Sequence, residues 1–159
     1  MKINEYIPSV EVQQFKDGEI VQINLLTFSR NKKVLLVGIP GAFSPTCSET
    51  HVPGYLNNAE KLRRMGIDDI VFLVTNDFFV VKAWEDRFDV QPNVHFFADG
   101  SQKFTKAANK LLDLTEAGLG IRGQRYASLI NDGCVQQIYI EPDATLVTVS
   151  GAEAMLGRL

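Results

Sequence analysis

The sequence predicts an α/β fold in which helices flank a central mixed β-sheet. Through most of the chain, short apolar runs rich in β-branched residues alternate with segments of helical periodicity. Near the C-terminal end this rhythm changes to a β-hairpin followed by a short helix. Strands joined through helices pair in parallel and the strands of a hairpin pair antiparallel, so one sheet is expected to contain both kinds of pairing.

Six segments are predicted as strands because they are short, apolar and rich in β-branched residues. In chain order they are Ile20–Asn24, Val34–Ile39, Ile70–Thr75, Val94–Ala98, Tyr126–Asn131 and Cys134–Ile140. The first alternates polar and apolar residues, whereas the next three are continuous apolar runs, as buried strands are. The last two flank Asp132-Gly133, the strongest short-range signal for a hairpin turn.

Four segments are predicted as helices. They run from Cys47 to about Met65, from a cap at Asn76 or Asp77 to Phe88, from about Gln102 to Leu112, and from about Ala152 to Leu159. The first helix is expected to be interrupted near Pro53-Gly54, since proline has no N–H to donate.

Composition restricts the class of protein. The 159 residues have ordinary hydrophobic (45%) and charged (22%) contents, which predicts one globular domain over residues 1–159. A net charge of −3 argues against a nucleic-acid partner. No stretch approaches the ~18 apolar residues of a membrane span, so no membrane partner is expected.

Two cysteines make neither a disulfide framework nor a metal site. Together with an N-terminus that lacks the apolar region of a secretory signal, they predict a reducing, cytoplasmic location. The chain also has no glycine-rich phosphate loop and no cluster with metal-ligand spacing. We therefore expect no metal and no cofactor.

Cys47 is the residue around which the predicted chemistry is built. It follows the Val34–Ile39 strand and a loop in which two prolines and a glycine interrupt regular structure. Thr46-Cys47-Ser48-Glu49 matches a capping box, which predicts Thr46 as N-cap and Cys47 in the first helical turn. Free N–H groups and the helix dipole at that position favour a thiolate, the nucleophilic form of cysteine.

Two motifs give the chain a family resemblance. Pro40, Ser44 and Cys47 have the spacing of the peroxiredoxin motif, and the string PGAFSPTCSETHVPGY resembles the type II, or peroxiredoxin-5, group. The segment Gly118–Ala127 is similar to that group's second signature, and the likeness extends from about Val21 to Leu159. The resemblance implies a thioredoxin-like fold and a thiol peroxidase that reduces hydrogen peroxide and alkyl hydroperoxides.

The resemblance also implies the roles of individual residues. Cys47 would be the nucleophile, and Arg125 the fixed positive charge that stabilises the thiolate and the leaving oxygen. Ser44 would offer a hydroxyl to the peroxide, where the family more often has threonine. Pro40 would line the peroxide pocket and exclude water from the sulfur, and Thr46 is also expected to contact the substrate. Arg122, three residues before Arg125, is the rival arginine and is given a supporting position.

The remaining candidates are less direct. His51 lies on the same helix face as Cys47 and could form a protease-like pair with it, but a buried structural hydrogen bond is the preferred interpretation. Cys134 is expected at a hairpin tip, about 20 Å of strand from Arg125, too far to form a disulfide with Cys47. The chain also lacks the second cysteine of the animal and plant relatives. We therefore expect a one-cysteine cycle completed by glutathione with glutaredoxin, or by thioredoxin.

Two further expectations remain open. A redox-sensing or interaction protein that uses Cys47 as a thiol switch is the alternative function, since it needs the same activated cysteine. The resemblance also implies a homodimer. Its physical support is the aromatic density at Phe43, Phe78, Phe79 and Trp84, on loops and helix starts expected near the pocket.

Overall fold

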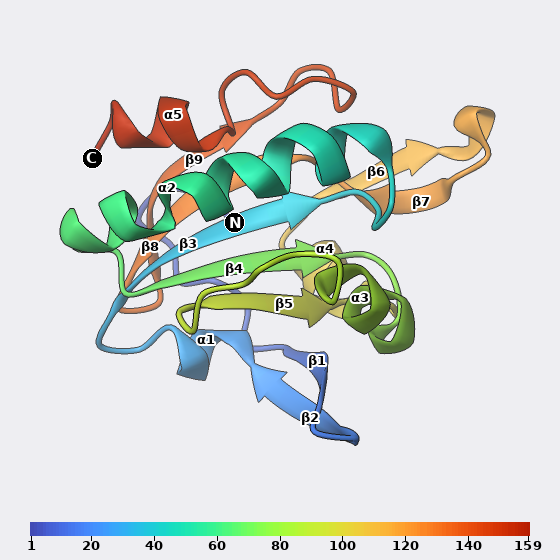
Figure 1. Cartoon of the computed structure of the whole chain (residues 1–159), viewed down its shortest axis with the longest axis horizontal. Helices are drawn as coiled ribbons and strands as arrows, with labels where there is room; N and C mark the ends of the chain where they lie inside the picture. The colour runs from blue at the N-terminus through green and yellow to red at the C-terminus, as the bar shows by residue number, and fades with distance from the viewer.

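A computed structural model describes all 159 residues and contains a seven-stranded mixed sheet with helices on both faces (Figure 1). The strands of this sheet are β1 (Glu11–Lys16), β2 (Glu19–Asn24), β3 (Lys33–Ile39), β4 (Asp69–Val74), β5 (Val94–Ala98), β8 (Tyr126–Asn131) and β9 (Cys134–Ile140). They lie in the order β2-β1-β5-β4-β3-β8-β9. The pairs β3–β4 and β4–β5 are parallel and the others antiparallel, which confirms the predicted mixed sheet.

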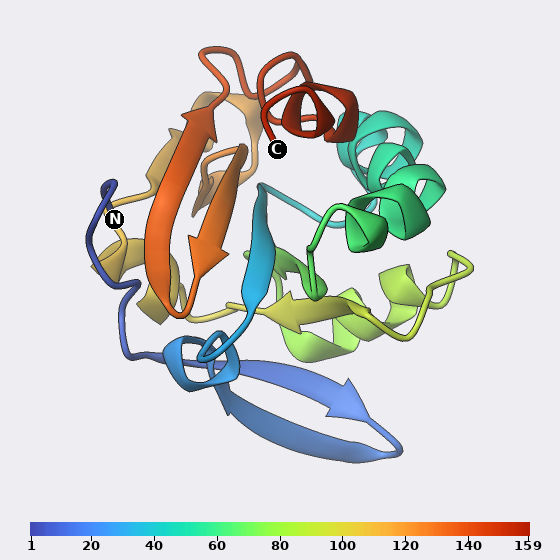
Figure 2. The same cartoon turned by 90° about the vertical axis from the view of Figure 1, so that its left-hand side faces the viewer.

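The helices cover both faces of the sheet. They are α1 (Leu25–Phe28), α2 (Val52–Arg64), α3 (Phe78–Glu85), α4 (Lys103–Ala107) and α5 (Ala152–Leu156), with a π-helical turn η1 (Cys47–His51) directly before α2 and a 3-10 turn η2 (Thr115–Ala117). Buried residues of α2, α3 and α5 pack on one face, whereas those of α1 and α4 pack on the other. Figure 2 shows α2 and α4 on opposite sides of the central strands.

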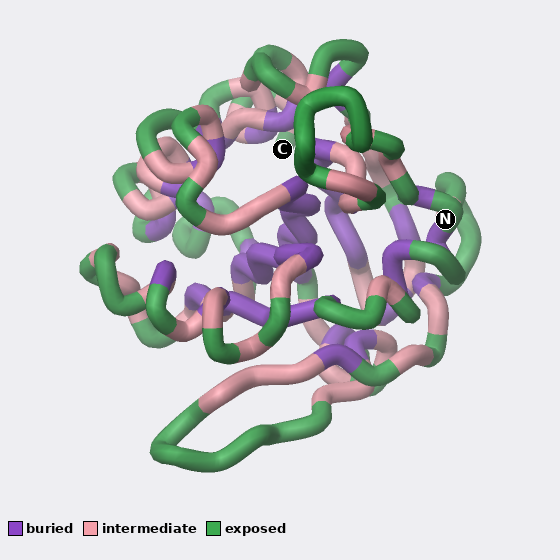
Figure 3. Tube along the Cα trace, turned by 90° about the vertical axis from the view of Figure 1, so that its right-hand side faces the viewer, coloured by how far each residue is buried: buried purple, intermediate pink, exposed green.

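Strand periodicity divides the core between the two faces. In β4, Ile70, Phe72 and Val74 belong to the cluster beneath α2, whereas Val71 and Leu73 belong to the cluster on the other face. Both sets are buried, which explains why the sequence of this strand is continuously apolar instead of alternating. The burial trace in Figure 3 accordingly shows the central strands as the most enclosed part of the chain.

The hairpin forms as predicted. Asp132 and Gly133 both have positive φ, 50° and 79°, as a two-residue turn between right-twisted strands requires. β8 and β9 then pair from Asn131↔Cys134 to Tyr126↔Ile140, with one irregularity between Leu129 and Ile130.

Gly38 brings the start of β8 close to β3. Gly38 pairs with Tyr126, and a Cβ at Gly38 would lie 2.3 Å from the Tyr126 ring. Only glycine leaves room for the ring at this position. Because Arg125 directly precedes Tyr126, this close approach fixes where the Arg125 side chain departs from the sheet.

Some predicted elements were wrong in extent. The helix expected from Gln102 to Leu112 ends at Ala107, since Asn109 has φ 56° and the chain then enters strand β6 (Leu111–Leu114). β6 pairs with β7 (Gly120–Gly123) in a two-stranded ribbon that projects from the body in Figure 1. Strands β1, β6 and β7 were not predicted. No helix is both long enough and apolar enough to cross a bilayer.

Candidate active site

The segment that connects β3 to Cys47 is a tight loop closed by backbone and side-chain hydrogen bonds. The Pro40 carbonyl accepts from Thr75 Oγ1 at 2.9 Å, and the Ala42 N–H donates to Asn76 Oδ1 at 2.8 Å. Phe43 has φ 64°, a conformation rare for an aromatic residue. The loop that leads to the cysteine is therefore strained locally and held in place by the residues that follow β4.

The capping box predicted at Thr46 is wrong. The helical stretch begins at Pro45, and Thr46 has helical backbone angles of −61° and −41° with no side-chain cap. Proline suits the first position of a helix because its fixed φ fits and its missing N–H has no partner there. The Thr46 hydroxyl donates instead to the Thr145 carbonyl at 2.8 Å. Because the helix begins at Pro45, Cys47 lies in its first turn but two positions further from the helix start than predicted.

Cys47 opens a π-helical turn. The Val52 N–H donates to the Cys47 carbonyl, a bond across five residues that replaces the usual α-helical one. The next residue, Pro53, has no N–H, so the wide turn passes into α2 without an unsatisfied donor. The interruption expected near Pro53-Gly54 is thus a change of helix type at residues 51–52. Cys47 itself is fully buried.

Arg125, the residue directly before β8, contacts Cys47. Its Nη2 donates to Cys47 Sγ at 3.0 Å, its Nη1 contacts His51 Nδ1 at 2.9 Å, and its Nε donates to the Ala144 carbonyl at 2.8 Å. Arg125 is only 2% exposed. Three of the five guanidinium N–H groups are therefore occupied, and one on each Nη nitrogen remains.

His51 is a neutral acceptor for this arginine. Arg125 has only N–H donors and the Ser150 carbonyl, 3.1 Å from His51 Nε2, only accepts, so His51 carries its proton on Nε2. Burial first, and then the charge of Arg125, lower the pKa of His51 from 6.5 to about 4. The buried structural bond expected for His51 is present, but sequence reasoning missed its contact with Arg125.

Ser44, Pro40 and Arg122 make contacts of their own. Ser44 Oγ donates to the Gly41 carbonyl at 2.8 Å, which leaves its lone pairs free, and Pro40 is buried at the end of β3. Arg122 does not contact Cys47. Its Nε donates to the Leu119 carbonyl at 2.8 Å and its Nη1 to the Thr75 carbonyl at 3.3 Å, so it fastens the β6–β7 ribbon to the end of β4.

A loop after β9, residues 142–150, completes the site and carried no recognisable sequence signal. It provides the Ala144, Thr145 and Ser150 carbonyls that accept from Arg125, Thr46 and His51. The Tyr55 hydroxyl also donates to the Ser150 carbonyl, at 2.7 Å. Sequence patterns report side-chain types, whereas these contacts use main-chain oxygens that any residue has.

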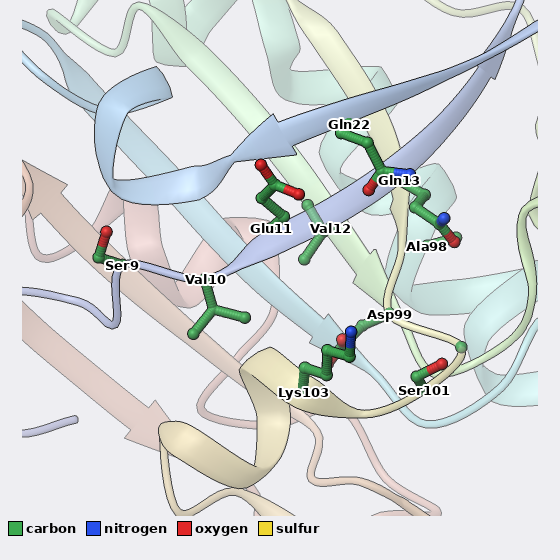
Figure 4. Close-up of a pocket in the computed structure, with 11 residues that line it drawn as sticks. Ser9, Val10, Glu11, Val12, Gln13, Gln22, Ala98, Asp99, Ser101 and Lys103 are labelled. Carbon is green, nitrogen blue, oxygen red and sulfur yellow. The ribbon is translucent and has the colours of Figure 1, made fainter.

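Two other features lie apart from this site. Cys134 is paired with Asn131 beside the hairpin turn, at the opposite end of β8 and β9 from Arg125. A polar hollow, lined among others by Glu11, Gln13 and Lys103, contains none of the predicted site residues (Figure 4). It lies where β1 and β5 pair only at Gln13↔Ala98.

No group of three or more histidine, cysteine, aspartate or glutamate side chains is placed to hold a metal ion. The reactive elements are a buried sulfur and an arginine that contacts it directly. A cysteine held in this way in the first turn of a helix, on a mixed sheet flanked by helices, defines a thiol enzyme with a thioredoxin-like fold.

Comparison with known proteins agrees with that class. The Redoxin family model matches residues 2–156. The chain is 43% identical to peroxiredoxin-2C of Oryza sativa subsp. japonica, over 99% of this chain and 97% of that protein. Among solved structures it is similar to reduced Prx3 of Vibrio vulnificus in complex with H2O2, with a TM-score of 0.92, 35% identity, and coverage of 99% and 95%. It is also similar to the Plasmodium falciparum antioxidant protein, described as a 1-Cys peroxiredoxin, with a TM-score of 0.90, 27% identity, and coverage of 99% and 98%.

The chain belongs to the redoxin family and, within it, to the peroxiredoxins of the type II, or peroxiredoxin-5-like, group. It is accordingly a thiol-dependent peroxidase.

Proposed function

We propose that Cys47 reduces hydrogen peroxide and alkyl hydroperoxides by direct attack of its thiolate on the O–O bond. The sulfur bonds to one oxygen, the O–O bond breaks, and the other oxygen leaves as hydroxide or alkoxide and takes up a proton. Cys47 is oxidised to a sulfenic acid and the peroxide is reduced to water or an alcohol. The observation that carries this proposal is the 3.0 Å contact between Arg125 Nη2 and Cys47 Sγ.

Arg125 would serve both ends of the displacement. Its charge beside the sulfur favours the thiolate, and its two remaining N–H groups can donate to the peroxide oxygens as negative charge develops on the leaving one. These donors are fixed before the reaction by His51 and the Ala144 carbonyl, so they need no reorganisation. Ser44 would accept from the peroxide through its free lone pairs, and Pro40 and Thr46 would bound the pocket.

We further propose that the cycle uses one cysteine. A thiol outside the chain attacks the sulfenic sulfur, releases water and forms a mixed disulfide, and a second thiol then restores Cys47. Cys134 lies at the far end of β9, and both cysteines are free. Because Cys47 is fully buried, the first helical turn must open before glutathione, glutaredoxin or thioredoxin can reach the sulfur.

Three wider proposals accompany this mechanism. Residues 1–159 would act as one domain in the cytoplasm, where a reducing environment keeps Cys47 as a thiol. The protein would form a homodimer. Phe79 and Phe43, which are 63% and 47% exposed, support an apolar contact surface. Trp84, expected to contribute, is fully buried and cannot. Sedimentation of the reduced protein at micromolar concentration should show a dimer, and a monomer would exclude this assembly.

One assay tests the function and the reductant together. Peroxide loss is followed in the steady state with glutathione and glutaredoxin, and in parallel with thioredoxin and its reductase. Cys134→Ser is the matched control, since it removes the other thiol. We expect sustained turnover for the wild type and for Cys134→Ser with at least one system. A single turnover that no reductant extends would instead favour the redox-sensing alternative. Loss of turnover in Cys134→Ser would contradict the one-cysteine cycle.

A further inference from the structure

Glu141, the residue directly after β9, accepts four hydrogen bonds from the loop that contacts Arg125. Its Oε1 accepts from the Thr148 N–H at 2.6 Å, the Ser150 N–H at 2.9 Å and the Ser150 hydroxyl at 2.8 Å. Its Oε2 accepts from the Thr148 hydroxyl at 2.7 Å. The residue is buried, and all four bonds go to the loop 142–150.

These four bonds favour an ionised carboxylate. Burial by itself would raise the pKa of Glu141, but the hydrogen bonds from Thr148 and Ser150 outweigh it, and the net direction is downward. No cation contacts the carboxylate, so its partners are the loop's own N–H and O–H groups. Glu141 is therefore a fixed point to which the loop is tied.

The tied loop in turn sets the direction of the guanidinium. One end of the loop gives the Ala144 carbonyl to Arg125 Nε, and the other gives the Ser150 carbonyl to His51, whose Nδ1 accepts from Arg125 Nη1. Glu141 is also bonded to Arg125 along the backbone, since its N–H donates to the Arg125 carbonyl at 2.9 Å. The contact that runs through His51 thus depends on Ser150, which the Glu141 carboxylate holds directly, while Ala144 belongs to the same loop.

We infer that Glu141 is a positioning residue for peroxide reduction: it ties the loop 142–150 so that Ala144 and His51 aim Arg125 at Cys47 and at the bound peroxide. Glu141 contacts neither the sulfur nor Arg125's side chain and acts only through the loop. This inference rests on the proposed role of Arg125. If the hydrogen bonds of Glu141 to the loop are lost, Arg125 keeps its charge but is no longer held in one orientation. Small misplacements of a reacting group can cost about 10²-fold in rate.

The test compares two substitutions of Glu141. Glu141→Ala removes all four bonds, and the rate of the reaction of Cys47 with hydrogen peroxide should fall by about 10-fold to 10²-fold. Glu141→Gln keeps an oxygen for the Thr148 and Ser150 N–H groups, and its amide can donate to the Thr148 hydroxyl. It should therefore restore most of the rate. If Gln is as slow as Ala, the charge and not the tie matters, and the inference is wrong.

Asp113→Ala is the matched control. Asp113 accepts from the Thr115 N–H and hydroxyl, at 2.9 and 2.5 Å, in the β6–β7 region, which reproduces the carboxylate–threonine contact away from Cys47. It should react at the wild-type rate. Should Glu141→Ala fail to fold, Thr148→Val, which removes one of the four bonds, takes its place with a smaller expected loss. A wild-type rate for whichever of these two variants folds would overturn the inference.

A double-mutant cycle with Arg125→Met separates this inference from the proposed function. If Glu141 acts through Arg125, removing the carboxylate, or the Thr148 hydroxyl in its place, should cost little more once Arg125 is gone. Additive losses would show that Glu141 acts by another route, and would overturn the inference while leaving Arg125 in its role. A wild-type rate for Arg125→Met alone would overturn the proposed role of Arg125, and the inference with it.

Discussion

His51 should make the folded protein sensitive to mild acid. In the unfolded chain its pKa is 6.5, whereas in the folded protein burial and Arg125 lower that pKa to about 4. Between these values the unfolded state binds a proton that the folded state does not, so the free energy of unfolding must fall as pH is lowered from 6.5 to 4. Above pH 6.5 both states are neutral at His51, and the effect vanishes.

The size of the effect follows from the two pKa values. At about 1.4 kcal/mol for each pKa unit, the drop from 6.5 to about 4 corresponds to about 3 kcal/mol of stability lost by pH 4. Replacement by the non-titrating glutamine should remove this share of the loss. Carboxylates whose pKa is lowered, such as Glu141 and Asp69, also destabilise the fold when acid protonates them. They are present in both the wild type and His51→Gln, so their effect cancels when the two are compared.

Urea unfolding measured at intervals from pH 7 to pH 4 would test this reasoning. The difference in free energy of unfolding between the wild type and His51→Gln should change by about 3 kcal/mol across that range, because the wild type loses stability more steeply. His95→Gln is the control, since it replaces the other histidine and must retain the His51 contribution. Parallel curves for the wild type and His51→Gln would refute the assignment of His51 as a buried neutral acceptor.

The remaining predictions concern the reaction itself. Arg125→Met should lower the rate of peroxide reduction by about 10²-fold to 10³-fold, and Arg122→Met by less, since Arg122 contacts only the Leu119 and Thr75 carbonyls. Stopped-flow kinetics with hydrogen peroxide would show the reverse order if Arg122 were the catalytic arginine. Ser44→Thr should stay active and Ser44→Val should not, because valine has nearly the shape of threonine without its hydroxyl. Equal rates for the two would remove that hydroxyl from the mechanism.

The fold was predictable where one local pattern dominated. β3, β4 and β5 are buried on both faces, so their apolar runs are unambiguous, and Asp132-Gly133 adopts the positive φ angles that its turn requires. β1 and the β6–β7 ribbon were missed because they are short or largely polar and contain no continuous apolar run, although each pairs with a strand close in sequence. Leu111 and Leu112 were read as the end of a helix, although pairing with Gly123 and Arg122 decides their conformation.

The candidate site divides in the same way. Cys47, Ser44 and Pro40 form one continuous motif, and its residue types reveal it. Thr46 was misread because a threonine three residues before a glutamate matches a capping box, while Pro45 had already started the helix. Glu141 and the loop carbonyls left no sequence signal, because their role comes from tertiary contacts with Arg125 and His51.

The fate of the two sulfurs after one equivalent of hydrogen peroxide tests the one-cysteine mechanism most directly. The reduced protein is mixed with peroxide in the absence of any other thiol, trapped with a reagent for sulfenic acids, and mapped by non-reducing peptide mass spectrometry. We expect one added oxygen on Cys47, an unchanged Cys134, and no oxidation in Cys47→Ser under the same conditions. A Cys47–Cys134 disulfide, or wild-type peroxide loss by Cys47→Ser, would contradict it.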